Sequence, residues 1–186
     1  MTLIEHTDKI WTIMNFLSLK DCRHLIAQSE EKSYQEATVS LPGGARMMKG
    51  LRDNYRQTFE DSHYAQSLFD KLHPYLPMID KTWHPARLNE RFRFYRYDVD
   101  QRFKRHIDGR VKAHGLESRL TVMVYLNSGF KGGETKFDNV TILPKTGTCL
   151  LFVHEQKHES LPIQAGQKYV LRSDVLYKNT DARDSL

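Results

Sequence analysis

Cysteine is scarce in this sequence, and no stretch is long and apolar enough to span a membrane. The 186 residues include two cysteines, Cys22 in a segment of helical pattern and Cys149 in an apolar stretch. We expect both to be buried free thiols, because so few cysteines offer no disulfide framework. This use of cysteine is typical of proteins kept in a reducing compartment.

The N-terminus lacks the features of a secretory signal. Glu5, Asp8 and Lys9 precede only a short apolar stretch, without a basic start or a small-residue cleavage site. We therefore expect a cytoplasmic protein that has no membrane partner.

The excess of positive charge is small. Lysine and arginine number 28 against 23 acidic residues, which gives a formal net charge of +5 and a pI of about 9.1. Such a balance permits an anionic partner without demanding nucleic acid. Much of the excess lies around a His-x-Asp sequence, in Arg91, Arg93, Arg96, Arg102, Lys104, Arg105, Arg110 and Lys112. Two interpretations stay open, a solvated basic face or a rim that attracts an acidic substrate.

The first half of the chain carries two helical patterns. Hydrophobic residues make up 39% of the chain, enough for one modest core, so we expect a single domain over residues 1–186. Ser18 and Asp21 form a capping-box pattern that predicts a helix running to about Lys32. A second helix is expected from Asp61 or Ser62 to the His73-Pro74 pair. Residues 1–17 are expected to be an irregular or extended lead-in, and residues 33–59 to be rich in loops.

After Pro85 the hydrophobic period changes to two. The predicted strands are 90–99, 119–127, 140–143, 147–154 and 167–177, which are rich in Val, Ile, Phe, Tyr and Thr. Helices followed by many short strands predict an α+β fold, a β-sandwich or jelly roll with the N-terminal helices packed on one outer face. Residues 1–86 then form a helical and loop support, and residues 87–178 the core.

The most informative residues are His106-Ile107-Asp108 and the distant His158. In a strand, residues i and i+2 point the same way, so His106 and Asp108 project together. With His158 they form a two-histidine, one-carboxylate set, which suits Fe(II) and leaves coordination positions open. The alternative is a surface histidine followed by an ordinary Asp-Gly turn at Asp108-Gly109.

A second metal pattern overlaps the first. Residues His154 to His158 read HExxH, which on a helix binds zinc as in metalloproteases. The preceding apolar run, Thr148–Val153, is typical of a strand, and Pro162 follows soon after. We therefore expect His154 to end a strand and to have no metal role.

Downstream charges on one strand face suggest an anion site. By alternation Lys168 and Arg172 lie on the same side of their strand, and buried cations need an anion. A dicarboxylate would supply one, and Tyr125 on a neighbouring strand would lie where it can donate to the same carboxylate. The alternative is an edge strand with its charges in solvent.

In these features the chain resembles the Fe(II)- and 2-oxoglutarate-dependent dioxygenases, and among them the prolyl 4-hydroxylase-like group. The resemblance covers about residues 88 to 177. Its elements, in order, are Tyr97, Phe103, His106-Ile107-Asp108, Leu120-Thr121, Tyr125-Leu126-Asn127, Gly132-Gly133-Glu134-Thr135, Phe137, Pro144-Lys145-Thr146-Gly147, Leu151-Phe152, His158-Glu159, Pro162, Gly166 and Lys168.

The resemblance implies a double-stranded β-helix core with His106, Asp108 and His158 as iron ligands. It implies that 2-oxoglutarate and dioxygen are co-substrates, and that ascorbate supports activity by maintaining Fe(II). Lys168 matches the basic residue that pairs with the far carboxylate of 2-oxoglutarate, and Arg172 is the alternative for that salt bridge. The tyrosines that line the co-substrate pocket in this group are matched by Tyr97 and Tyr125. The carboxylate of Asp108 favours hydroxylation, because related halogenases carry a small residue there.

The substrate is less constrained than the core. We expect hydroxylation of a peptidyl residue, proline first, or of a free amino acid. Oxidative dealkylation of a nucleic acid, with Trp11 or Trp83 stacking on bases, and a binding module without chemistry stay open as alternatives. Residues 33–59 are the expected lid or substrate segment, and their candidate contact residues are Arg46, Arg52, Asn54 and Arg56.

Overall fold

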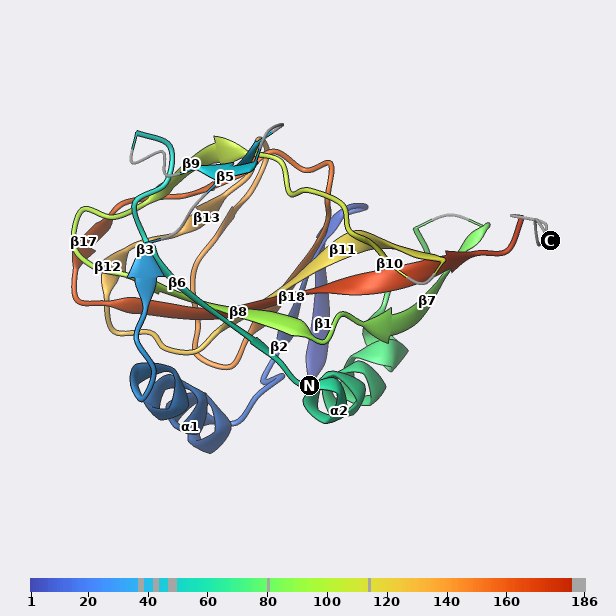
Figure 1. Ribbon diagram of the computed structural model, residues 1–186, viewed down its shortest axis with the longest axis horizontal. Coiled ribbons are helices and arrows are strands. Elements are labelled where there is room, and N and C mark those ends of the chain that lie inside the picture. Colours follow the sequence, from blue (N-terminus) through green and yellow to red (C-terminus); the bar gives the residue numbers. More distant parts are fainter. Residues whose placement is uncertain (37–38, 42–43, 47–49, 80, 114, 182–186) are drawn as a thin grey trace.

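Two facing β-sheets form the centre of the fold, and two helices cover the outer face of the larger sheet (Figure 1). The computed structural model describes residues 1–36, 39–41, 44–46, 50–79, 81–113 and 115–181. The helices are α1 (Leu19–Glu30) and α2 (Ser62–Leu72), and a 3-10 turn follows α2 at His73–Tyr75. In the described residues, no helix has the length and apolar character needed to cross a membrane.

The large sheet is antiparallel and takes strands from every part of the chain. In hydrogen-bonded order its strands are β1 (Thr2–Thr7), β2 (Ile10–Met14), β15 (Cys149–Val153), β11 (Leu116–Tyr125), β18 (Lys168–Asn179), β8 (Arg91–Tyr97), β6 (Tyr55–Glu60) and β3 (Gln35–Glu36). Off this path, β10 (Lys112–Ala113) pairs with β11, and β7 (Trp83–Leu88) pairs with β18.

The small sheet faces it and carries two of the candidate metal ligands. Its order is β14 (Thr141–Ile142), β13 (Thr135–Lys136), β16 (His158–Ser160) and β9 (Phe103–His106). Two short pairs complete the fold, β12 (Lys131–Gly132) with β17 (Ile163–Ala165), and β4 (Val39–Leu41) with β5 (Gly44–Arg46).

Both helices begin where the sequence predicts. The Ser18 hydroxyl accepts from the Asp21 backbone N–H, and the Asp21 carboxylate accepts from the Ser18 backbone N–H, which is a complete capping box. The Asp61 carboxylate accepts from the Tyr64 backbone N–H at the start of α2. The first helix ends at Glu30, slightly before the predicted Lys32.

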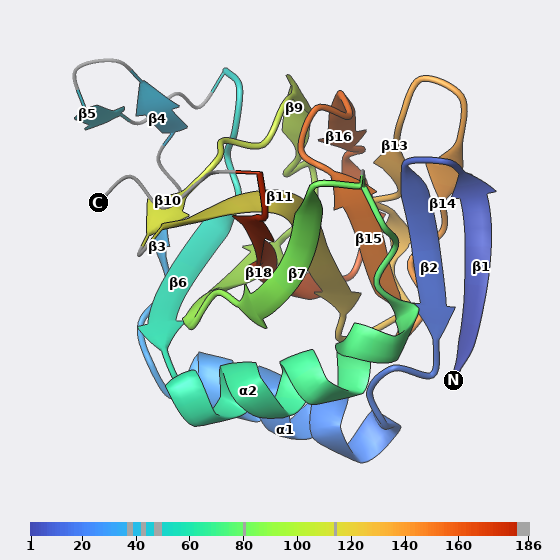
Figure 2. The same ribbon diagram turned by 90° about the vertical axis from the view of Figure 1, so that its right-hand side faces the viewer.

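The alternation of side chains along the strands creates two cores. On β18, Leu171 and Val175 pack toward the helices in one buried cluster, whereas Val170 packs in a second cluster on the opposite face. Both faces of β18 are buried. One face is apolar, and the other carries Lys168 and Arg172. Figure 2 shows the helices on one side of the large sheet and the small sheet on the other. The predicted arrangement of helices on one outer face is confirmed.

The structure decides two expectations for the first half of the chain. Residues 1–17 were expected to be irregular or extended, and they are extended, because β1 and β2 form a hairpin whose second strand pairs with β15. The expected loop 33–59 includes most of β6, which pairs with β8 from Tyr55 to Glu60. Its side chains are largely half-exposed and polar, so its hydrophobic pattern is weak and only the long-range pairing makes it a strand.

Candidate metal centre and its cavity

A cavity of about 490 Å³ lies between the large sheet and the strands β9 and β16. All three candidate iron ligands, His106, Asp108 and His158, line it together with Lys168 and Arg172. The sequence therefore predicted five residues that the fold brings to one hollow from three separate segments.

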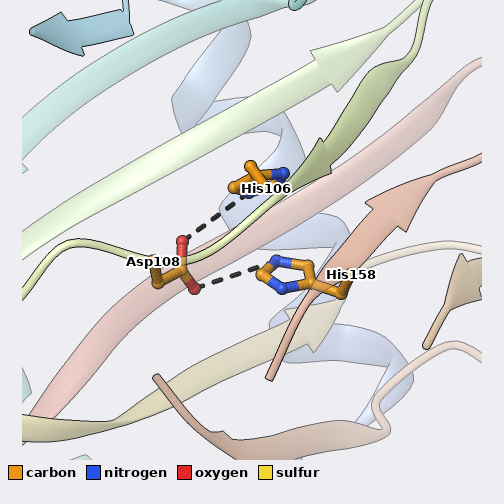
Figure 3. A group of neighbouring side chains, drawn as sticks. All are labelled: His106, Asp108 and His158. Carbon is orange, nitrogen blue, oxygen red and sulfur yellow. Dashed lines mark ion pairs between the residues drawn. The ribbon is translucent and has the colours of Figure 1, made fainter. Parts of the chain in front are cut away.

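The three candidate ligands converge on one point (Figure 3). His106 and His158 are directly opposite each other where β9 pairs with β16, and Asp108 follows two residues after His106. The Nε2 atom of His106 lies 3.7 Å from Asp108 Oδ1, and that of His158 lies 3.9 Å from Asp108 Oδ2. One ligand atom from each residue lies within 4.8 Å of the others, so a single ion fits among them.

Hydrogen bonds on the far side of each ring set the tautomers of the histidines. Nδ1 of His106 lies 2.8 Å from the carbonyl oxygen of Lys104, and Nδ1 of His158 lies 2.9 Å from that of Gln156. A carbonyl oxygen only accepts, so each Nδ1 carries the hydrogen and each Nε2 presents its lone pair to the site.

Both histidines are held neutral. Burial is the main cause that lowers the pKa of His106, to about 3, and the neighbouring His158 lowers it further. Burial also lowers the pKa of His158. Phe103 stacks on His106 with 3.5 Å between ring centroids, and Phe152 meets His158 edge-on at 4.5 Å. Neutral imidazoles fixed by aromatic neighbours are ready metal ligands.

The carboxylate of Asp108 is ionised and oriented. Burial by itself raises its pKa, but Arg172 first, and then the two histidines, hold the pKa of this carboxyl far below its usual range. Thr121 Oγ1 donates to Asp108 Oδ2 at 2.7 Å, and Arg172 Nη2 lies 3.1 Å from the same oxygen. Two neutral imidazoles and one ionised carboxylate are the donor set that Fe(II) takes in oxygenases, so the residues present fit that metal.

Arg172 extends the polar network behind the ligands. Its Nη2 also lies 3.0 Å from Asp174 Oδ1, and Arg93 Nη1 lies 3.3 Å from Asp174 Oδ2. His154 is almost fully buried and its Nε2 lies 3.5 Å from Asp174 Oδ1, outside the ligand cluster. Because β15 ends at Val153 and His158 begins β16, no helix joins the two histidines of the HExxH pattern.

Another part of the cavity holds a buried ammonium group. Lys168 is 1% exposed, and its Nζ donates to the Gly133 carbonyl at 2.6 Å and to Ser160 Oγ at 3.0 Å. Burial lowers the pKa of Lys168 to about 7, although Glu134 acts in the opposite direction. Within the described residues no carboxylate forms an ion pair with Lys168, so the amine suits an anionic ligand.

Tyr97 and Tyr125 both lie near Lys168, but only Tyr97 lines the cavity. Lys168 Nζ is 5.1 Å from the ring centroid of Tyr97 and 5.6 Å from that of Tyr125. Tyr97 lines the cavity, whereas Tyr125 lies behind it and its hydroxyl is 2.7 Å from Oγ1 of Thr135, which does line it.

Sequence reasoning missed several residues of the cavity. The face of β11 that carries Tyr125 also carries Thr121, and alternation along that strand was the signal that could have identified it as a partner of Asp108. Tyr95 lies among three arginines. Burial opposes its ionisation, but Arg52, Arg172 and Arg93 lower the pKa of its phenol.

The candidate contact residues of segment 33–59 differ in their positions relative to the cavity. Arg52 and Arg56 line the cavity, and Asn54 is buried and accepts from Arg52 Nε at 2.6 Å. The side chain of Arg46 lies outside the described residues. In the described lining of the cavity neither tryptophan is present: Trp11 packs in the helix-side core, and Trp83 lies on β7 beside Arg119.

The chain matches a known protein family. The sequence profile of the 2OG-Fe(II) oxygenase superfamily matches residues 92–173, which include every candidate ligand. Among curated proteins of Arabidopsis thaliana, the chain is 25% identical over 174 residues to "Probable prolyl 4-hydroxylase 11", covering 82% of this chain and 58% of that protein. It is 23% identical over 192 residues to "Prolyl 4-hydroxylase 2", covering 83% and 62%. The chain thus spans less than two thirds of the length of these relatives.

Solved structures share the fold. A prolyl hydroxylase from Trichoplax adhaerens, solved with a hypoxia inducible factor peptide fragment, superposes with a TM-score of 0.71 at 18% identity, over 91% of this chain and 84% of that one. The viral collagen prolyl hydroxylase of Paramecium Bursaria Chlorella virus-1 gives 0.62 at 23% identity, over 90% and 96%. A Pseudomonas putida prolyl-4-hydroxylase gives 0.66 at 18%, over 90% and 91%. These likenesses confirm the predicted α+β double-stranded β-helix.

Proposed function

We propose that the chain is a member of the 2OG-Fe(II) oxygenase superfamily, whose profile matches residues 92–173, and that it is an iron- and 2-oxoglutarate-dependent hydroxylase of a peptidyl residue or an amino acid. One observation carries the proposal: His106, Asp108 and His158 face the same cavity as the buried Lys168. A metal ligand set and an anion-binding ammonium in one hollow are what a dicarboxylate co-substrate requires.

In this proposal His106, Asp108 and His158 hold the iron, and Lys168 binds the far carboxylate of 2-oxoglutarate. When bound, the iron supplies the activation of dioxygen that accompanies decarboxylation of 2-oxoglutarate to succinate. Tyr97 and Ser160 border Lys168 and would position the carboxylate beside it. Arg172 would act on the iron site through Asp108, since it contacts that carboxylate at 3.1 Å.

Apolar side chains would keep this chemistry dry. Phe103, Phe152 and Val170 line the cavity that holds the ligands and Lys168. Exclusion of water strengthens the electrostatic contacts of the co-substrate and limits side reactions. The protein therefore supplies orientation, charge and a water-poor cavity rather than a further reacting group.

Proline is the first substrate to test. The likeness to proteins named prolyl hydroxylases supports it. Leu51 and Arg52, from the segment before β6, line the cavity and can contact a substrate there. Residues in loops outside the metal site decide such specificity. We further propose that ascorbate sustains turnover and that the protein acts in the cytoplasm.

The test is succinate formation from 2-oxoglutarate by protein loaded with Fe(II) under nitrogen and then exposed to oxygen. Wild type should form succinate, and His158→Ala should not, whereas His154→Ala should retain turnover. Omitting ascorbate should shorten the period of linear turnover. If wild type binds iron and 2-oxoglutarate but forms no succinate with any proline peptide, amino acid or oligonucleotide, the binding module without chemistry replaces this proposal.

A further inference from the structure

The cavity wall is rich in arginine beyond the residues needed for the co-substrate. Within the described lining, Asp108 is the single carboxylate, whereas the cationic lining residues are Arg52, Arg56, Arg91, Arg93, Arg110, Lys168 and Arg172. A concave site with such an imbalance attracts anions.

Several of these cations already have protein partners. Arg172 and Arg93 contact Asp174, and Arg110 pairs with Glu117 and Glu155. Lys168 is assigned above to 2-oxoglutarate. Arg52 differs from them, because among the described residues no carboxylate pairs with it.

Arg52 is a buried guanidinium with an unused donor. It is 5% exposed, and its Nη2 atom is buried without a hydrogen-bond partner in the described residues. Since arginine does not lose its proton at physiological pH, a positive charge remains in a poorly solvated place. An anion entering the cavity would relieve that state.

The guanidinium is also held rigidly. Its Cζ lies 4.4 Å from the ring centroid of Tyr95 and 4.4 Å from that of Phe103, and its Nε donates to Asn54 at 2.6 Å. A fixed planar fork binds a carboxylate with little loss of side-chain entropy.

The position of Arg52 connects it to the metal site. Phe103, which contacts Arg52 on one side, stacks on the candidate ligand His106 at 3.5 Å. One aromatic ring therefore separates the guanidinium from the iron ligands. Lys168 and Arg172 lie on β18, where they pair with Tyr97 and Arg93, whereas Arg52 precedes β6 and contacts Tyr95 and Phe103.

We propose that Arg52 binds a carboxylate of the primary substrate, so that the enzyme acts on an acidic substrate. The inference rests on the proposed hydroxylase function and names its substrate class. The carboxylate belongs either to an acidic side chain next to the hydroxylated residue of a peptide or to the side chain of a free acidic amino acid. A nucleic-acid backbone is disfavoured, because Arg52 lies inside the cavity rather than on an exposed basic surface.

The test measures binding without turnover, using protein loaded with Mn(II) and 2-oxoglutarate under nitrogen. One probe is an array of nonapeptides with a central proline and randomised flanking positions. The second probe pairs free glutamate with glutamine, and the third is a single-stranded oligonucleotide. Wild type should prefer Asp or Glu at one flanking position, or glutamate over glutamine, by tenfold or more, and the responding probe identifies the source of the carboxylate.

Variants assign that preference to Arg52. Arg52→Met keeps the apolar stem between the two rings and should reduce the preference at least tenfold, while 2-oxoglutarate affinity stays within twofold. Arg52→Lys keeps the charge and should retain part of the preference. Arg91→Gln, at the exposed rim, should weaken it by about two- to fivefold, as expected for a screened charge. Arg23→Gln, on the exposed face of α1, makes the same charge change away from the cavity and should have no effect.

Other outcomes overturn the inference. In wild type, either the absence of a preference for an acidic probe or tighter binding of the oligonucleotide than of any acidic probe contradicts it. In folded Arg52→Met, either an undiminished preference or a loss of 2-oxoglutarate binding contradicts it. Failure of the hydroxylase proposal is seen separately, as absent succinate formation by iron-loaded wild type, because the binding measurements do not depend on turnover.

Discussion

The Arg172 guanidinium joins two buried carboxylates, with Nη2 at 3.1 Å from Asp108 Oδ2 and at 3.0 Å from Asp174 Oδ1. The resemblance suggested Arg172 as an alternative partner of 2-oxoglutarate. In the fold its guanidinium instead contacts the candidate iron ligand and the acid behind it. Both carboxylates raise the pKa of Arg172, against the effect of its burial. Its charge therefore serves to keep Asp108 ionised and oriented.

Removing this charge should weaken the metal site. Arg172→Met leaves Asp108 and Asp174 buried without their shared partner, so we expect Fe(II) affinity to fall about 10–100-fold and the free energy of unfolding to fall by about 3–5 kcal/mol. Anaerobic titration with Fe(II) and denaturant unfolding measure the two effects. Arg93→Met is the matched control, since Arg93 contacts Asp174 but forms no ion pair with Asp108 in the part of the chain that the structure describes. Equal loss of iron affinity in both variants would contradict a specific role for Arg172.

The two histidines of the HExxH pattern should behave differently on substitution. His158→Ala removes a candidate ligand, so the purified protein should retain little iron. His154→Ala should bind iron with nearly wild-type stoichiometry but unfold at lower temperature, because it leaves a cavity beside the buried Asp174. Metal analysis and thermal unfolding of the metal-free proteins separate these outcomes. If His154→Ala loses iron while its fold stays intact, His154 is a metal ligand, which contradicts this assignment.

Lys168 should contribute to binding rather than to stability. Lys168→Met keeps the length of the side chain and removes the charge, so 2-oxoglutarate affinity should fall about 100-fold, corresponding to about 3 kcal/mol for a buried charged hydrogen bond. The stability of the metal-free protein should stay equal or increase, because a desolvated cation is removed. Calorimetric titration and unfolding measure these quantities, with the exposed Lys20→Met as a control. Unchanged 2-oxoglutarate affinity would exclude Lys168 as the carboxylate partner.

The pKa of about 7 at Lys168 predicts proton uptake on co-substrate binding. Above pH 7 the free amine is mostly neutral, and the incoming carboxylate favours its charged form, so binding should take up nearly one proton at pH 8.5 and little at pH 6. Affinity should fall as pH rises above 7. Calorimetry in buffers of different ionisation enthalpy detects the uptake, and Lys168→Met should abolish it.

The lowered pKa of Lys168 also makes the stability of the fold depend on pH. The lysine binds its proton less tightly in the folded state than in the unfolded chain, where its pKa is near 10.5. The unfolded state therefore binds more protons between those values, and this group contributes increasing stability as pH rises from about 7 to 10.5. Comparing wild type with Lys168→Met across that range isolates the contribution.

Gly133 should be required for the lysine site. Its φ is +71°, and an added Cβ would lie 2.4 Å from Ile163 Cδ1 and 3.2 Å from Lys168 Cδ. Gly133→Ala should therefore lower both stability and 2-oxoglutarate affinity. Gly109→Ala is a matched control beside Asp108, because a Cβ there meets nothing within 4 Å. Equal behaviour of the two variants would show that the close approach at Gly133 is unimportant.

Local sequence patterns predicted the parts of the fold that depend on neighbouring residues. The Ser18–Asp21 capping box defines the start of α1 because its contacts are three residues apart. The strands β8, β11, β15 and β18 are visible because burial of both faces or of alternate residues leaves a strong pattern. By contrast, β6 is stabilised by its pairing with β8, and that pairing has no local signature.

The sequence by itself determined the residue types of the candidate metal site and the closeness of His106 and Asp108, which are two residues apart where β9 ends at His106. Only the tertiary structure decided that His158 lies opposite His106, that Arg172 contacts Asp108, and that Arg52 is buried between two aromatic rings. Those relationships join residues from different strands and loops. They are decided by strand register and by burial of charge, which depend on the distances created when both sheets close around one cavity.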